Sequence, residues 1–166
     1  MDAYMTNGTL EFIKKLVAKH PQIDFHLMSS GNGTLAYYEN NSENVFASGR
    51  GFEVIMDNGK IEEKGFVVMN NITVTDDGRT VFEDRFKQRN ASVDSSPGFQ
   101  AFRLLRPKSG NTYIVLTQWA TVEDFDNWKK SDAFKKQHPN GVGDTKPPAF
   151  FADKPFLTMY NMVNPD

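Results

Sequence analysis

An asparagine stands in the middle of an otherwise apolar strand face. The stretch GFVVMNNITV alternates so that one strand face carries four apolar side chains and one amide: Phe66, Val68, Asn70, Ile72 and Val74. Asparagine is depleted in strands, and a buried amide without partners costs about 1–3 kcal/mol. Asn70 therefore has two interpretations. As a structural residue, it bonds a nearby backbone group or sits at the open end of a barrel. As a functional residue, it points into an apolar pocket and offers its NH₂ group to a ligand.

A histidine ends the basic stretch NWKKSDAFKKQH, residues 127–138. A histidine at a helix C-terminus is often a surface residue, because the helix macrodipole favours positive charge there, and His20 before Pro21 fits that interpretation. His138 differs from His20 in its neighbours, because three aromatic residues precede it on the same predicted helix, 121–138: Phe125, Trp128 and Phe134. Taken alone, His138 would have the same surface interpretation as His20.

The spacing of Trp128 and His138 limits what one helix can build. Ten residues at about 100° each leave the two side chains roughly 80° apart around an unbroken helix. They line one pocket only if the pocket is wide or the helix is interrupted. Ser131 and Asp132 offer an interruption, because Ser131 is a good N-cap for a new turn. Packing in the core remains an alternative for Trp128.

The composition excludes several classes of site. The chain has no cysteine, which removes disulfides, zinc–thiolate sites, iron–sulfur clusters and a cysteine nucleophile. A formal net charge of −2 argues against a nucleic-acid binder. There is no Gly-rich phosphate loop, H-E-x-x-H motif, nucleophile elbow or EF-hand loop. Because no signal peptide and no membrane-spanning apolar run is found, we expect a cytoplasmic protein that does not bind membranes.

Four acidic residues are interpreted as structural. Glu83, Asp84, Glu123 and Asp124 are expected at the starts of helices, where carboxylates favour the macrodipole. Thr121 with Asp124 is expected to form a capping box.

The order of the expected elements predicts an α+β fold. The first sixty residues contain a short strand, a helix that follows Thr9 as N-cap, and further strands. The later elements are a strand at 65–74, a helix within 75–93, strands at 98–107 and 111–120, a helix at 121–138 and a strand at 156–163. This β-α-β-β-α-β order is the split βαβ, ferredoxin-like pattern. A polar, turn-rich stretch at 57–65 indicates a boundary, so we expect an N-terminal half at 1–62 and a C-terminal domain at 63–166.

Several of these segments resemble the antibiotic biosynthesis monooxygenase (ABM) superfamily, and within it the haem-degrading monooxygenases of the IsdG and HmoB type. The resemblance rests on the strand FVVMNNITV, the strand pair GFQAFRLLRP and YIVLTQWA, and the helix FDNWKKSDAFKKQH. The family motif W-x-x-S-x-x-[FY]-x-x-x-H is matched by Trp128, Ser131, Phe134 and His138, and the strand asparagine by Asn70. The HmoB-like proteins of Gram-positive bacteria also share the N-terminal half, including a segment like FEVI at 52–55.

The resemblance implies a role for each of these residues. His138 would be the proximal ligand of haem iron, and Asn70 would hydrogen-bond bound dioxygen on the opposite side. Trp128 would press on the porphyrin and hold it out of plane. Phe66, Val68, Phe125 and Phe134 would complete the haem-binding surface. Haem would be both cofactor and substrate, opened at a meso carbon with O₂ and an external electron donor, with release of iron.

The resemblance also implies how the two halves combine. The short family members are dimers, whereas the HmoB type uses its N-terminal half in place of the second subunit. The fold would then be a dimeric-αβ-barrel-like unit within one chain. Because residues 1–60 hold no second Asn/Trp/His set, we expect a monomer with one haem site.

Two other functions remain open. The first is a regulatory or interaction protein of the staphylococcal TRAP type, with a vestigial pocket. The second is a cofactor-free oxygenase of the same superfamily acting on an aromatic substrate, which would need no iron ligand at His138.

Overall fold

The computed structural model describes residues 1–40, 43–88, 91–131 and 151–163. Along the chain the elements are β1 (Asp2–Gly8), α1 (Leu10–Ala18), β2 (His26–Ser30), β3 (Gly33–Asn40), β4 (Arg50–Gly59), β5 (Phe66–Thr73), α2 (Arg79–Lys87), a short 3-10 helix (Ala91–Ser95), β6 (Phe99–Pro107), β7 (Thr112–Trp119), α3 (Val122–Lys129) and β8 (Phe156–Val163). The predicted β-α-β-β-α-β order of the C-terminal part is confirmed by β5, α2, β6, β7, α3 and β8. No helix in the described ranges is long and apolar enough to cross a membrane.

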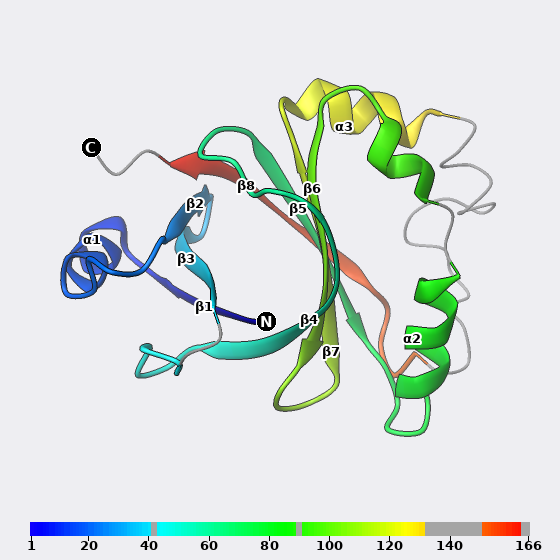
Figure 1. Cartoon of the computed structure of the whole chain (residues 1–166), viewed down its shortest axis with the longest axis horizontal. Helices are drawn as coiled ribbons and strands as arrows, with labels where there is room; N and C mark the ends of the chain where they lie inside the picture. Colours follow the sequence, from blue (N-terminus) through cyan, green and yellow to red (C-terminus); the bar gives the residue numbers. More distant parts are fainter. Residues whose placement is uncertain (41–42, 89–90, 132–150, 164–166) are drawn as a thin grey trace.

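The eight strands close into one antiparallel barrel in the order β1-β3-β2-β8-β5-β7-β6-β4. Read from β4, the order β4-β1-β3-β2 is followed by β8-β5-β7-β6, so the first half repeats the arrangement of the second. The halves join where β2 pairs with β8 and where β4 pairs with β6. Figure 1 shows α1 on one side of the barrel and α2 and α3 on the opposite side. The expected barrel within a single chain is thus confirmed.

Side chains that alternate along the strands fill the barrel interior. Val67 and Met69 of β5 point inward, where they join a cluster that includes Met5, Leu35 and Ile114. The other face of the C-terminal strands is covered by the helices, so β5 is buried on both sides. The expected face of apolar residues around Asn70 is therefore confirmed, and it lies outside the barrel, beneath α2 and α3.

The interior also holds one buried ion pair. Arg103 Nε lies 2.7 Å from Glu39 Oε2, and the two side chains are 5% and 14% exposed. Arg103 Nη1 also donates to the carbonyl oxygens of Asn58 and Gly59, at 3.1 and 2.9 Å. Tyr37 donates its hydroxyl to Glu39 Oε2 at 2.6 Å, and burial raises the pKa of Tyr37. Both charges are therefore compensated within the barrel.

The helix caps follow the sequence signals. Thr9 accepts a hydrogen bond from the backbone N–H of Phe12, and Thr121 accepts one from the N–H of Asp124. Thr9 is thus confirmed as an N-cap. Of the capping box predicted for Thr121 and Asp124, the N-cap bond is confirmed, but the carboxylate of Asp124 accepts from the hydroxyl of Thr121 rather than from its backbone N–H.

One predicted range was wrong. A continuous helix was predicted over 121–138, but α3 ends at Lys129. Helix α2 spans Arg79–Lys87, within the predicted range 75–93, and a separate 3-10 helix follows it. The polar stretch 57–65 includes the end of β4 at Gly59, and residues 60–65 connect β4 to β5.

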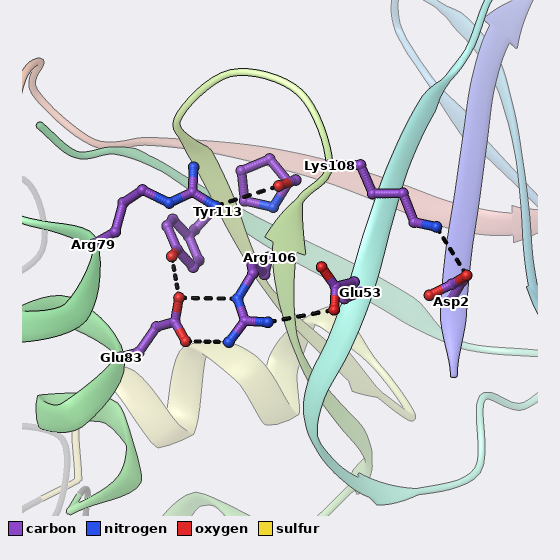
Figure 2. A network of polar contacts seen from close by, with 8 residues as sticks. Asp2, Glu53, Arg79, Glu83, Arg106, Lys108 and Tyr113 are labelled. Atoms are coloured by element: carbon purple, nitrogen blue, oxygen red, sulfur yellow. Dashed lines mark hydrogen bonds and ion pairs between the residues drawn. The ribbon is translucent and has the colours of Figure 1, made fainter. Parts of the chain in front are cut away.

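The interpretation of Glu83 and Asp84 as first-turn residues was also wrong, because α2 begins at Arg79. Glu83 instead accepts hydrogen bonds from Arg106 at 2.5 and 3.0 Å and from the hydroxyl of Tyr113 (Figure 2). The guanidinium of Arg106 lowers the pKa of Glu83, and burial together with Glu83 raises the pKa of Tyr113 to about 12. Arg106 also reaches Glu53 of β4 at 3.4 Å. The carboxylate of Glu83 therefore fastens α2 to the sheet.

Candidate functional site

The outer face of β5 forms the floor of the candidate site together with its two neighbouring strands. Directly paired residues of an antiparallel sheet point to the same side, so the register identifies the floor. Across from Phe66, Val68 and Asn70 lie Trp119, Thr117 and Val115 of β7. Across from the same three residues on the other side lie Asn161, Met159 and Leu157 of β8. We call these nine residues the floor.

One end of the floor is covered by an aromatic cluster, defined as Phe66, Val68, Val93, Phe99, Trp119, Phe125, Trp128 and Leu157. Trp119 is fully buried at its centre. Its ring centroid lies 5.6 Å from that of Trp128 and 5.9 Å from that of Phe125. The ring centroids of Phe66 and Phe125 are 6.2 Å apart. The structure therefore brings four predicted haem-binding residues together: Phe66, Val68, Phe125 and Trp128.

Two neighbouring asparagines on β5 have opposite environments. Asn71 is 4% exposed and points into the barrel, where its amide nitrogen donates to Met69 O, Phe156 O and Thr158 Oγ1 at 3.2–3.3 Å. Asn70 is half-buried on the floor, and its side chain has no hydrogen bond to any residue in the described ranges. An amide held on an apolar surface without a protein partner is available to a ligand.

Trp128 stands in the last turn of α3, where the helix stops. The C-cap is Lys130, and the hydroxyl of Ser131 donates to the carbonyl oxygen of Trp128 at 2.6 Å. An interruption near Ser131 was predicted, and the end of α3 agrees with it. Phe134 and His138 lie outside the described residues, so the structure does not place them relative to Asn70 and Trp128.

The floor and the aromatic cluster contain no ionisable side chain. One charged side chain contacts the cluster: Nζ of Lys129 lies 4.7 Å from the ring centroid of Phe125 and 3.3 Å from Asp126. Within the described ranges, no group of three or more His, Asp or Glu residues could hold a metal ion. The site therefore suits a flat, apolar ligand contacted by a few neutral polar groups.

Sequence reasoning missed Thr117. Its Oγ1 accepts a hydrogen bond from Nε1 of Trp119 at 3.0 Å, and its side chain is half-buried on the floor. The alternation of β7 was readable from the sequence, but its register against β5 was not. That register is what places Thr117 opposite Val68.

An open hollow of about 580 Å³ lies beside the segment that connects β4 to β5, and it shares Phe99 with the aromatic cluster. Its lining is dominated by ionisable side chains: Asp24, His26, Lys60, Glu62, Glu63 and Lys64, with Ile61, Phe99 and Gln100. Burial lowers the pKa of His26. The charged lining distinguishes this hollow from the uncharged floor, and we place the candidate site at the floor.

The C-terminal part of the chain matches a known protein family. Residues 65–140 match the model of the antibiotic biosynthesis monooxygenase family. A haem-degrading monooxygenase of Listeria monocytogenes is 25% identical over 133 residues, which cover 80% of each chain. The signal transduction protein TRAP of Staphylococcus aureus is 28% identical over 131 residues, covering 79% of this chain and 78% of that protein.

Solved structures share the whole fold. A major regulator of staphylococcal pathogenesis superposes with a TM-score of 0.85 at 23% identity, covering 99% of this chain and 100% of that one. A haem-degrading enzyme from Listeria monocytogenes gives a TM-score of 0.75 at 20% identity, covering 97% and 99%. Residues 65–140 therefore match the antibiotic biosynthesis monooxygenase family, and the chain is similar to both a haem-degrading monooxygenase and the TRAP proteins.

Proposed function

We propose that the protein is a haem-degrading monooxygenase, which opens the porphyrin at a meso carbon with O₂ and an external reductant and releases iron. One observation carries the proposal: the amide of Asn70 has no partner in the described ranges and stands on an uncharged, mostly apolar floor beside Trp128. A structural asparagine would be expected to resemble Asn71, whose amide nitrogen makes three contacts. The relationship to a haem-degrading enzyme supports the choice of ligand.

Each residue has a proposed task. The floor and the ring of Trp128 hold the flat ligand, while Phe66, Val68 and Phe125 exclude water from beneath it. Asn70 donates a hydrogen bond to an oxygen atom on the floor side. On the strength of the motif alone, His138 would hold the iron and Phe134 would contact the ligand beside it. Haem itself supplies the oxygen-activating iron when bound.

Since the floor and cluster offer no redox group apart from the haem, the electrons must come from an external donor, either a reductase or a small reductant. The same lack of ionisable side chains means that protons must reach the site from solvent or from residues beyond the floor. We propose that Trp128 restricts the porphyrin to one orientation by contact rather than by charge, because Trp119 supports its ring from behind.

We further propose one haem site per chain and a monomeric protein, with 1–62 as the barrel-completing half and 63–166 as the haem-binding domain. The corresponding outer face of the first half is already filled by its own aromatic rings. Tyr38 packs against Tyr4, Phe25 and Phe46, each with ring centroids 5.3 Å from its own. Such packing leaves no apolar floor for a second flat ligand.

Two alternatives have specific support. The sequence identity of 28% to the staphylococcal TRAP protein exceeds that of 25% to the Listeria haem-degrading monooxygenase, which favours a regulatory protein of the TRAP type. The uncharged floor would also hold a flat organic molecule, which favours a cofactor-free oxygenase that acts on an aromatic substrate.

A hemin titration tests the proposal. Wild type should show a saturable Soret shift at one haem per chain, followed by bleaching and iron release when ascorbate is added with catalase present. His138→Ala should lose the shift, whereas His20→Ala, at the end of α1, is the matched control and should keep it. Haem binding that His138→Ala leaves unchanged refutes the ligand assignment. If wild type shows no Soret shift, the haem function is refuted and the regulatory protein or the cofactor-free oxygenase takes its place.

A further inference from the structure

We infer that Thr117 is a second hydrogen-bond donor of the haem site and acts beside Asn70 on the same ligand atom. This inference rests on the proposed function. Thr117 and Asn70 are the only polar residues among the central six of the floor, which are Val68, Asn70, Val115, Thr117, Leu157 and Met159. Both are half-buried, so both face a surface that a ligand can reach.

The strand register places the two side chains within reach of one atom. Thr117 is directly opposite Val68, and Asn70 is directly opposite Val115, so Thr117 and Asn70 are diagonal neighbours on the same face. Diagonal neighbours lie about 7–8 Å apart, and their Cβ atoms are somewhat closer. Two hydrogen bonds of about 2.9 Å, added to the lengths of the side chains, span that separation. One oxygen atom between the two side chains can therefore accept from both.

The hydrogen bond from Trp119 leaves the hydroxyl of Thr117 as a donor. A threonine oxygen has two lone pairs and one hydrogen. The indole N–H of Trp119 donates to this oxygen at 3.0 Å and so occupies one lone pair. Thr117 donates its own hydrogen to no residue in the described ranges. The hydroxyl hydrogen of Thr117 points away from the indole, because that side of the oxygen already accepts the hydrogen bond from Trp119.

Trp119 holds this arrangement in place. Its ring is fully buried and packs against Phe99, Phe125 and Trp128, so the indole N–H cannot move far from Thr117. The donor is therefore oriented before any ligand arrives, which avoids a cost of reorganisation on binding. Two oriented donors favour a ligand atom with two lone pairs over one that accepts weakly.

Thr117→Val tests the inference, because valine keeps the shape and removes the hydroxyl; Thr117→Ser keeps the hydroxyl and is the matched control. Three quantities are measured: haem affinity from the Soret titration, azide affinity of the ferric complex, and carbon monoxide affinity of the ferrous complex. Azide accepts hydrogen bonds well and carbon monoxide poorly. In Thr117→Val we expect azide to bind about 3- to 10-fold more weakly, while haem and carbon monoxide stay within about twofold of wild type. Thr117→Ser should resemble wild type in all three.

Two outcomes overturn the inference while leaving the haem function intact. One is an azide affinity that Thr117→Val does not change. The other is an equal loss of azide and carbon monoxide affinity, which would mean that the substitution only displaces Trp119 and reshapes the site. If wild type gives no Soret shift, the proposed function falls and this inference falls with it.

Discussion

The neighbouring asparagines of β5 should respond in opposite directions to the same substitution. Asn70→Leu places an apolar side chain on an apolar floor, between Val115 and Leu157, and removes an amide without a protein partner in the described ranges. Asn71→Leu makes the same chemical change inside the barrel, where the amide donates to two carbonyl oxygens and one hydroxyl. We expect Asn70→Leu to stabilise the protein and Asn71→Leu to destabilise it.

The magnitudes follow from burial and hydrogen bonding. Full burial of a leucine contributes about 1.5–3 kcal/mol, so the half-buried position 70 should gain about 1 kcal/mol. Removing the partly desolvated amide adds about 0.5–1 kcal/mol, so the total gain is about 1.5–2 kcal/mol. Asn71→Leu forfeits its hydrogen bonds and leaves their acceptors buried, which should lower the free energy of unfolding by about 1–3 kcal/mol. The two variants should therefore differ by at least about 2 kcal/mol.

Urea unfolding of the haem-free protein measures both free energies under identical conditions. Asn70→Leu should also lose haem degradation, as expected where a residue is kept for function at the expense of stability. The reasoning is refuted if Asn70→Leu destabilises the protein as much as Asn71→Leu does. That result would mean that Asn70 satisfies its amide within the folded chain and is a structural residue.

Three further predictions concern the sheet and the barrel. Glu83→Gln should lower the free energy of unfolding by about 1–3 kcal/mol at neutral pH. Arg106 holds the folded pKa of Glu83 below its ordinary value of 4.5, so the difference in stability between wild type and Glu83→Gln should shrink as the pH falls below 4.5. Urea unfolding at pH 7 and at about pH 3 measures this difference, and a constant difference would contradict the prediction. Arg103→Met should lower the free energy of unfolding by about 3–5 kcal/mol, because it leaves Glu39 charged in the interior without its partner. The double variant Arg103→Met with Glu39→Leu should lose less in the same assay. A larger loss in the double variant would disprove the ion-pair account. Gly59→Ala should lower Tm by several degrees, because Gly59 has φ +74° and an added Cβ would lie 2.2 Å from a backbone oxygen of β6; an unchanged Tm in calorimetry would oppose this.

The local parts of this molecule were predictable from sequence because local interactions determine them. Alternation along β5 placed Val68 and Asn70 on one face, and the side chains of Thr9 and Thr121 fixed the starts of two helices. The stop near Ser131 was also visible, since a serine that bonds the preceding turn competes with continuation of the helix.

The remaining features depend on pairs of residues far apart in the chain. The ion pair of Arg103 with Glu39 joins residues separated by 64 positions, and no local pattern indicates that separation. The pairing of Glu83 with Arg106 likewise replaced the predicted interaction with a helix dipole. The place of Thr117 on the floor depends on the register of β7 against β5, because strand propensity does not specify which residues of two strands face each other.

Closure of the barrel within one chain affects how its halves assemble and diverge. When two separate chains build such a barrel, its formation depends on protein concentration, and every substitution is imposed twice. Here the contacts of β2 with β8 and of β4 with β6 form intramolecularly, at an effective concentration that dilution does not change. Each substitution also occurs once, so the half that carries α1 can accumulate packing aromatic residues while the other half keeps a polar position such as Asn70. The fold thereby allows the two halves to change independently of each other.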